Sequence, residues 1–114
     1  MAQEANPFGG SIEHLSVEEV KAGLEAGTIL LVDVREPNET DAESIPGAVA
    51  FPLSTFDAAA LPDPGDKTLV FSCRSGQRSQ KASAAAQAAG LDLHRHMAGG
   101  ILAWKAAGFP TETP

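Results

Sequence analysis

The sequence contains a single cysteine, Cys73, in 114 residues. One cysteine excludes an internal disulfide bond, and it also excludes a metal site built from several cysteine ligands. Structural disulfides are characteristic of oxidising compartments, so a chain that cannot form one fits the reducing cytoplasm. We therefore expect a cytoplasmic protein whose only thiol is free.

Long hydrophobic runs are also missing. Residues 29–32 form one of the longest uninterrupted apolar stretches, whereas a membrane-spanning helix needs about 20 apolar residues. Residues 1–10 lack the basic start and the apolar core of a signal peptide, and their Asn, Pro and Gly content is typical of a flexible leader. The sequence therefore predicts no membrane partner and no secretory signal.

Positive charge is scarce in the first part of the chain. The net charge is −7, with 15 acidic and 8 basic side chains, and residues 1–66 carry 13 of the acidic ones. Binding to nucleic acid requires a cationic surface that contacts the phosphates, so we expect no nucleic-acid partner. Residues 67–114 carry a net charge of +4, and Arg74, Arg78 and Lys81 lie close to Cys73 in the sequence.

Hydrophobic periodicity and turn residues predict strands that alternate with helices. Ser16 and Glu19 form a capping box at the start of a helix that ends at Gly27. Strands are predicted at 29–34, 49–51, 68–72 and 91–97, and helices from Pro37, over 53–60, over 79–89 and from Gly99. This alternation predicts a parallel sheet with helices on both faces, in a single domain.

Cys73 follows the apolar run of residues 69–71 and precedes a stretch of arginine, serine and glycine. A lone cysteine after such a run is usually a buried side chain without chemistry. In an open α/β sheet, however, ligands bind beyond the carboxyl ends of the strands, where loops lead into helices. Cys73 is predicted at such an edge, and the positive end of the following helix favours an anion such as a thiolate.

The loop after Cys73 has the residues that a nucleophilic thiolate needs. The thiolate, not the thiol, is the nucleophile, and Arg74 and Arg78 supply positive charge that stabilises it. Gly76 lets the backbone turn tightly, so that loop N–H groups can face inward. The residues alone leave two interpretations of Cys73 open, an inert buried side chain and a nucleophile.

Four segments of the sequence resemble one family. Residues 73–78, CRSGQR, are similar to the active-site loop of single-domain rhodanese-like sulfurtransferases. Three further segments are similar to motifs of the same family in the same order: LVDVREP at 31–37, IPGAVAFPLS at 45–54 and GGILAWKAAGFP at 99–110. The resemblance covers nearly the whole chain from about residue 11 to residue 110.

The resemblance implies a fold and a domain organisation. It implies an α/β protein with the rhodanese-like three-layer α/β/α fold and a five-stranded parallel sheet. We expect a single rhodanese-like domain at 11–110, between a flexible leader at 1–10 and a short C-terminal tail at 111–114.

The resemblance also implies a sulfurtransferase mechanism. Cys73 would attack the outer sulfur of thiosulfate or a related donor, release sulfite and become a persulfide, which then passes its sulfur to cyanide or a thiol. A protein could also serve as sulfur donor or acceptor. No metal or organic cofactor is implied. The residues expected to bind the anionic donor are Arg74, Ser75, Gly76, Gln77 and Arg78, with Arg35 as an additional positive charge.

Two alternatives remain open at this point. Some phosphatases and arsenate reductases share the general fold, but their cysteine and arginine are separated by five residues, whereas four residues lie between Cys73 and Arg78. The shorter loop suits a sulfur atom better than a phosphate. Other rhodanese-like domains only bind protein partners, and these commonly replace the cysteine, so the presence of Cys73 favours an enzyme.

Several other residues have structural interpretations. We expect Asp33 and Arg35 to connect the end of their strand to neighbouring backbone, and His14 to be an exposed residue before the first helix. His94 and His96 are expected on one face of a strand, without a metal ion. One position departs from the family pattern: Ser44 stands where a histidine usually precedes Ile-Pro-Gly-Ala, so that this turn must be stabilised differently.

Overall fold

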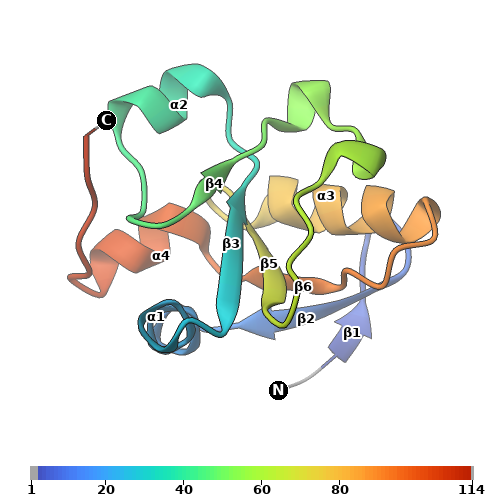
Figure 1. Cartoon of the computed structure of the whole chain (residues 1–114), viewed down its shortest axis with the longest axis horizontal. Helices are drawn as coiled ribbons and strands as arrows, with labels where there is room; N and C mark the ends of the chain where they lie inside the picture. The colour runs from blue at the N-terminus through green and yellow to red at the C-terminus, as the bar shows by residue number, and fades with distance from the viewer. Residues whose placement is uncertain (1–2, 114) are drawn as a thin grey trace.

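The computed structural model describes residues 3–113 and contains a six-stranded sheet with the order β1-β2-β6-β5-β3-β4 (Figure 1). The strands β2, β6, β5, β3 and β4 run parallel to one another, and β1 pairs antiparallel with β2. The strands are β1 (Gln3–Ala5), β2 (Ser11–Leu15), β3 (Ile29–Asp33), β4 (Val49–Ala50), β5 (Thr68–Ser72) and β6 (Arg95–Met97).

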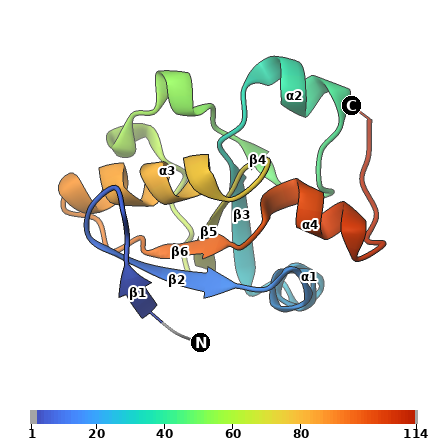
Figure 2. The ribbon, with the colours of Figure 1, turned by 180° about the vertical axis from the view of Figure 1, so that it is seen from behind.

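Helices cover both faces of the sheet (Figures 1 and 2). Four α-helices are present among residues 3–113: α1 (Val17–Ala26), α2 (Pro37–Ala42), α3 (Gln77–Ala88) and α4 (Gly100–Ala106). Two short 3-10 helices, η1 (Leu53–Thr55) and η2 (Ala58–Ala60), lie between β4 and β5. The three-layer α/β/α architecture is therefore confirmed, with five parallel strands and one antiparallel strand added at the edge.

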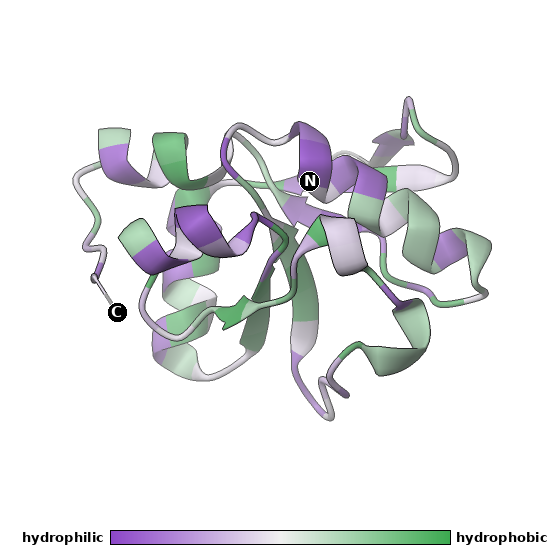
Figure 3. Ribbon diagram, turned by 90° about the horizontal axis from the view of Figure 1, so that it is seen from above, coloured by the Kyte–Doolittle hydropathy of each residue, from purple (hydrophilic) through white to green (hydrophobic). Residues whose placement is uncertain are grey.

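The core is divided between the two faces of the sheet because successive strand residues point in opposite directions. On β5, Val70 belongs to a cluster that includes residues of α1 and α4, while Phe71 belongs to a second cluster with residues of α3. Leu31 and Val32 of β3 are divided in the same way. Both faces of these strands are buried, which explains their continuous apolar sequence, and Figure 3 shows the central strands mainly in green.

The helix after Ser16 forms as predicted. The Ser16 side chain accepts a hydrogen bond from the Glu19 N–H, and the Glu19 carboxylate accepts one from the Ser16 N–H, which completes the capping box. The helix ends at Gly27, which has a φ of 74°, a left-handed conformation that glycine adopts without strain. α3 begins at Gln77, two residues before the predicted start, because the chain already turns at Gly76.

The beginning of the chain differs from the expectation. Residues 1–10 were expected to form a flexible leader, whereas Gln3–Ala5 pair with Ser11–Leu15 in the sheet; residues 1 and 2 lie outside the described part. His14 was expected to be exposed before the first helix, but it lies half-buried on β2 opposite His96. β1 and β2 contain many polar residues, so no apolar run marks them in the sequence. Their pairing with neighbouring strands determines where they form.

Two other predicted elements are divided or shortened, and the turn at Ser44 has a stabilising partner that the sequence did not identify. The helix predicted over 53–60 is divided into η1 and η2, since the Asp57 side chain accepts a hydrogen bond from the Ala59 N–H and starts a new turn. The strand predicted at 91–97 contains only Arg95–Met97. The backbones of Ser44 and Glu112 exchange two hydrogen bonds of 2.8 Å, so the C-terminal segment holds the turn at Ser44.

No helix within residues 3–113 is long and apolar enough to cross a membrane.

Candidate functional site

The structure places Cys73 directly after β5, at the carboxyl ends of the parallel strands. Its side chain is 1% exposed and packs in the cluster on the α3 face of the sheet. The Gly76 N–H donates a hydrogen bond to Sγ of Cys73 at 3.1 Å, and the Ser79 hydroxyl lies 3.5 Å from the same sulfur. The loop therefore curls back over the sulfur, with α3 starting beside it.

Gly76 makes this loop geometry possible. Its φ is 105°, in the region that favours glycine. A Cβ at this position would also lie 3.2 Å from the backbone nitrogen of Gly99. Since the first N–H groups of a helix have no partner within the helix, the start of α3 adds a positive potential at the sulfur.

The start of α4 holds the loop from the other side. The N–H groups of Ile101 and Leu102 donate to the carbonyl oxygens of Cys73 and Arg74 at 2.9 and 3.1 Å. A Cβ at Gly100 would collide with both of these oxygens. Because the two carbonyls face α4, the loop can direct its N–H groups toward the sulfur. The sequence identified Gly99 and Gly100 only as a helix start and missed this contact.

Arg78 does not stand free in the loop. Its Nη1 and Nη2 donate to the two carboxylate oxygens of Glu39 on α2 at 2.6 and 2.8 Å. The hydrogen bond from Arg78 lowers the pKa of Glu39 from 4.5 to about 2. The pKa of Arg78 is raised, first by Glu39 and to a lesser extent by the nearby Cys73. Arg78 therefore contributes positive charge near the sulfur while its hydrogen-bonding groups bind Glu39, a residue that sequence analysis did not identify.

Arg35 is buried and connects β3 to α2. Its side chain is 5% exposed and binds the carboxylate of Asp33, with Nη2 2.7 Å from Oδ2. The same Nη2 donates to the carbonyl oxygen of Glu43 at 2.8 Å, and Nη1 donates to that of Glu39 at 3.4 Å. Asp33 and Arg35 thus connect the strand end to neighbouring backbone, as expected.

Arg74, Ser75 and Gln77 are the exposed residues of the loop. Arg74 forms no ion pair with any residue in the range 3–113, so its charge is available to a ligand. A cavity of about 240 Å³ opens beside it, and its charged lining residues are Arg35, Glu39, Glu43, Arg74 and Lys105. Arg74 is the one loop residue in its lining, and Cys73 is not part of it.

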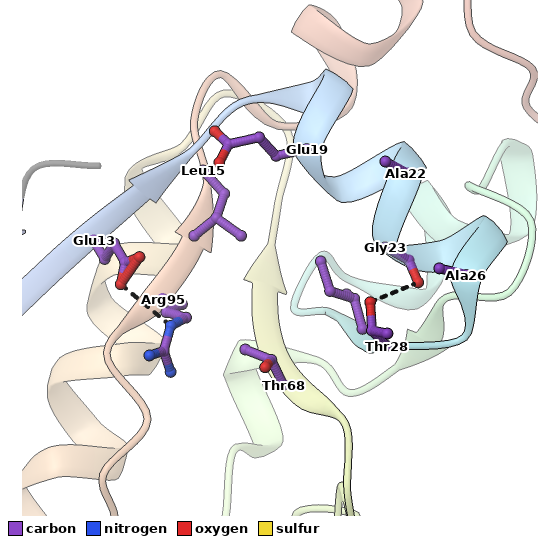
Figure 4. A pocket seen from close by; sticks show the side chains of 10 residues that line it. Glu13, Leu15, Glu19, Ala22, Gly23, Ala26, Thr28, Thr68 and Arg95 are labelled. Atoms are coloured by element: carbon purple, nitrogen blue, oxygen red, sulfur yellow. Dashed lines mark hydrogen bonds and ion pairs between the residues drawn. The ribbon is translucent and has the colours of Figure 1, made fainter.

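A larger cavity, of about 440 Å³, lies at the amino ends of the central strands, opposite the end that carries Cys73 (Figure 4). It is lined by Thr28 and Thr68, at the amino ends of β3 and β5, and by the ion pair of Glu13 and Arg95, whose atoms are 3.2 Å apart. Cys73 follows the other end of β5. This cavity is therefore remote from the sulfur, and we assign no part of the chemistry to it.

The rhodanese-like domain family matches residues 16–107, which include the loop, α2 and the start of α4. The chain belongs to this family. The match extends over most of the sheet and both layers of helices, so it covers every residue that contacts the sulfur or the loop carbonyls.

Relatives of this rhodanese-like domain include proteins named as sulfurtransferases. An uncharacterised protein of Synechocystis, slr1261, is 45% identical over 83 residues, which are 73% of this chain and 46% of that protein. A sulfurtransferase of Allochromatium vinosum is 36% identical over 86 residues, or 75% of this chain and 80% of that protein. The solved structure of the human single-domain sulfurtransferase TSTD1 has a TM-score of 0.69 and 31% identity, covering 82% of this chain and 95% of that one.

Other relatives are longer than this rhodanese-like domain. The chain spans only 24–46% of the length of the curated relatives that are 39–45% identical to it.

The ion pair of Glu39 and Arg78 should stabilise the domain in a pH-dependent way. Because the folded state lowers the pKa of Glu39 from 4.5 to about 2, the stabilisation is complete above pH 4.5 and is lost as the pH falls from 4.5 to 2. Both side chains are partly exposed, at 30% and 24%, so water screens the pair and we expect about 1 kcal/mol. Glu39→Gln should lose this amount at pH 7 and almost nothing near pH 2.

Urea unfolding at pH 7, 4.5 and 3 measures this difference. Asp41→Asn is a matched control, since Asp41 lies on the same helix, is exposed and forms no ion pair with residues 3–113. A difference between wild type and Glu39→Gln that stays constant over this pH range would contradict the prediction.

Proposed function

We propose that this rhodanese-like domain is a sulfurtransferase that carries sulfane sulfur on Cys73 as a persulfide. The observation that carries the proposal is the position of Sγ, which receives the Gly76 N–H at 3.1 Å inside a loop held by α4. Such a loop favours negative charge on the sulfur. Relatives named as sulfurtransferases, at 27–36% identity, support the same chemistry.

The first half-reaction forms the persulfide. The Cys73 thiolate attacks the outer sulfur of thiosulfate, a new S–S bond forms, and the donor's own S–S bond breaks with its electron pair leaving on sulfite. The terminal sulfur of the persulfide is anionic. The loop N–H groups from Arg74 to Arg78 would stabilise it, and the exposed Arg74 would attract the anionic donor.

The second half-reaction returns the enzyme to its starting state. A thiolate acceptor attacks the terminal sulfur, forms a persulfide of its own, and leaves the electron pair of the broken S–S bond on Cys73; cyanide would give thiocyanate in the same way. No second cysteine exists in the sequence, so an internal disulfide cannot remove the sulfur. The persulfide must therefore react with another molecule, which can be cyanide, a small thiol or a protein.

The contacts of Arg78 disfavour the phosphatase alternative. A phosphate-binding loop uses the guanidinium group as a bidentate partner of the phosphate oxygens. In this domain the carboxylate of Glu39 already occupies that side of Arg78. The loop amides and Arg74 remain available to a ligand. The amides suit a single sulfur atom, and the exposed charge of Arg74 attracts an anion without a bidentate contact.

The intact mass of the reduced protein, before and after incubation with thiosulfate, tests the proposal. We expect a gain of one sulfur atom that maps to the peptide containing Cys73 and that disappears on addition of cyanide. Protein alkylated at Cys73 beforehand is the control and should gain nothing. No gain with either thiosulfate or a polysulfide would overturn the proposal and favour a domain that only binds partners.

A further inference from the structure

A chain of hydrogen bonds leads from Cys73 to His14, and His14 in turn faces the carboxylate of Glu4 at the edge of the sheet. Sγ of Cys73 lies 3.5 Å from Oγ of Ser79, and this hydroxyl lies 2.8 Å from Nδ1 of His96. Nε2 of His96 lies 2.7 Å from Nδ1 of His14, and Nε2 of His14 lies 3.4 Å from the carboxylate of Glu4. Every adjacent pair in the chain is in contact, without a gap for water.

The fold builds this chain from four elements. Ser79 lies on the first turn of α3, which packs over the sheet. His96 of β6 and His14 of β2 are direct neighbours in the sheet, and Figure 2 shows these two strands side by side. Glu4 comes from β1. Exposure increases along the chain: Ser79 and His96 are at most 1% exposed, whereas the side chains of His14 and Glu4 are 32% and 62% exposed. The chain therefore leads from the buried thiol to solvent.

His96 is suited to pass a proton along this chain. Burial, and to a lesser extent His14, lower the pKa of His96 to about 4, so its ring is neutral at physiological pH. A neutral imidazole has one donor and one acceptor nitrogen. With Nε2–H donating to His14, Nδ1 accepts the Ser79 hydroxyl proton, and the Ser79 oxygen is free to accept the thiol proton.

Few charged groups lie next to these residues. Glu4 faces His14 from β1, and Arg78 lies near Cys73 with its charge paired to Glu39. Lys81 of α3 is directed to the ring of Phe8, 5.2 Å from its centroid. The remaining charged pair on β2 and β6, Glu13 with Arg95, occupies positions next to His14 and His96 and therefore points to the opposite face of the sheet.

We propose that Ser79, His96 and His14 form a proton relay that carries the proton of the Cys73 thiol to the surface and so generates the nucleophile. This proposal rests on the proposed function, because it concerns the thiolate that attacks the sulfur donor. The S–H proton passes to Ser79, whose own proton passes to Nδ1 of His96. The Nε2 proton of His96 passes to Nδ1 of His14, which becomes an imidazolium beside the Glu4 carboxylate.

The relay gives the buried Cys73 thiol a route by which its proton can leave. The thiol is 1% exposed, and its hydrogen-bond partners among residues 3–113 are the Gly76 N–H, which cannot accept a proton, and Ser79. A serine hydroxyl accepts a proton only if it passes its own proton on. His14 and Glu4 then release the proton to water without opening the loop.

The pH profile of Cys73 alkylation by iodoacetamide tests the relay in wild type, His14→Gln and Ser79→Ala. Both variants interrupt the chain, one near the surface and one at the thiol. We expect each to shift the profile to higher pH by about one unit, which lowers the alkylation rate at pH 7 by about tenfold. His94→Gln is the matched control, since His94 pairs with Asp92 outside the chain, and its profile should coincide with that of wild type.

A second measurement uses the wild-type protein, with no residue of the relay replaced. The NMR titration of the His14 ring is compared in free protein and in protein alkylated at Cys73, where no thiol proton remains. The relay predicts a shifted titration midpoint after alkylation, because coupling between two sites is reciprocal. Unchanged alkylation profiles in both variants, or an unchanged His14 titration, would overturn the relay. Failure of sulfur loading with shifted profiles would instead reject the proposed function and leave the relay in place.

Discussion

Replacing Cys73 by serine should abolish sulfur transfer and leave the fold intact. A serine hydroxyl is not ionised near neutral pH and cannot form a persulfide, so the rate should fall by at least about 10³-fold, as for other nucleophile substitutions. The folded state should change little, because Oγ of serine can accept the same hydrogen bond from the Gly76 N–H and occupies a similar volume.

Steady-state transfer from thiosulfate to cyanide, together with urea unfolding, separates the two effects. The double variant Cys73→Ser/Ser75→Cys is a sharper control, since it returns a thiol to the same loop at an exposed position. The amide cradle is built around position 73, so this variant should remain inactive. Activity retained by Cys73→Ser would show that sulfur transfer does not proceed through this cysteine.

Replacing Arg35 by methionine should destabilise the domain more than any surface change. The substitution leaves Asp33 buried, with its side chain only 3% exposed and without its cationic partner. Breaking a buried ion pair from one side costs about 3–5 kcal/mol, a large part of the roughly 5–15 kcal/mol that stabilises a typical domain. The carbonyl oxygens of Glu39 and Glu43 also lose a donor, so α2 and the Glu39–Arg78 pair should become less ordered.

Urea unfolding at pH 7 measures the loss, and the double variant Asp33→Asn/Arg35→Met is its control. Removing both charges relieves the unpaired carboxylate, so the double variant should be more stable than the sum of the single variants predicts. A loss below about 1 kcal/mol in Arg35→Met would be typical of a surface ion pair and would contradict a structural role for this arginine.

The sequence by itself determined the parts of the protein that depend on local chemistry. The capping box of Ser16 and Glu19 and the left-handed end at Gly27 act within one helix. The strand before Cys73 and the turn at Gly76 likewise depend on residues a few positions apart. Local hydrogen bonds and backbone preferences decide these features, which is why the parallel α/β architecture and the loop at Cys73 could be predicted.

Only the tertiary structure decided which distant residues meet at the loop. Glu39 and Arg78 are separated by 39 positions, and His14 and His96 by 82. Neither pair has a local pattern. Glu39 and Arg78 lie on two separate helices, α2 and α3, which only the packing of the fold brings together. His14 and His96 lie on β2 and β6, short strands whose register comes from their neighbours in the sheet. The sequence supplied the thiol and the turn around it, while the packing of α2, α4 and the edge strands determined which charges are paired, which carbonyls are held and where a proton can leave.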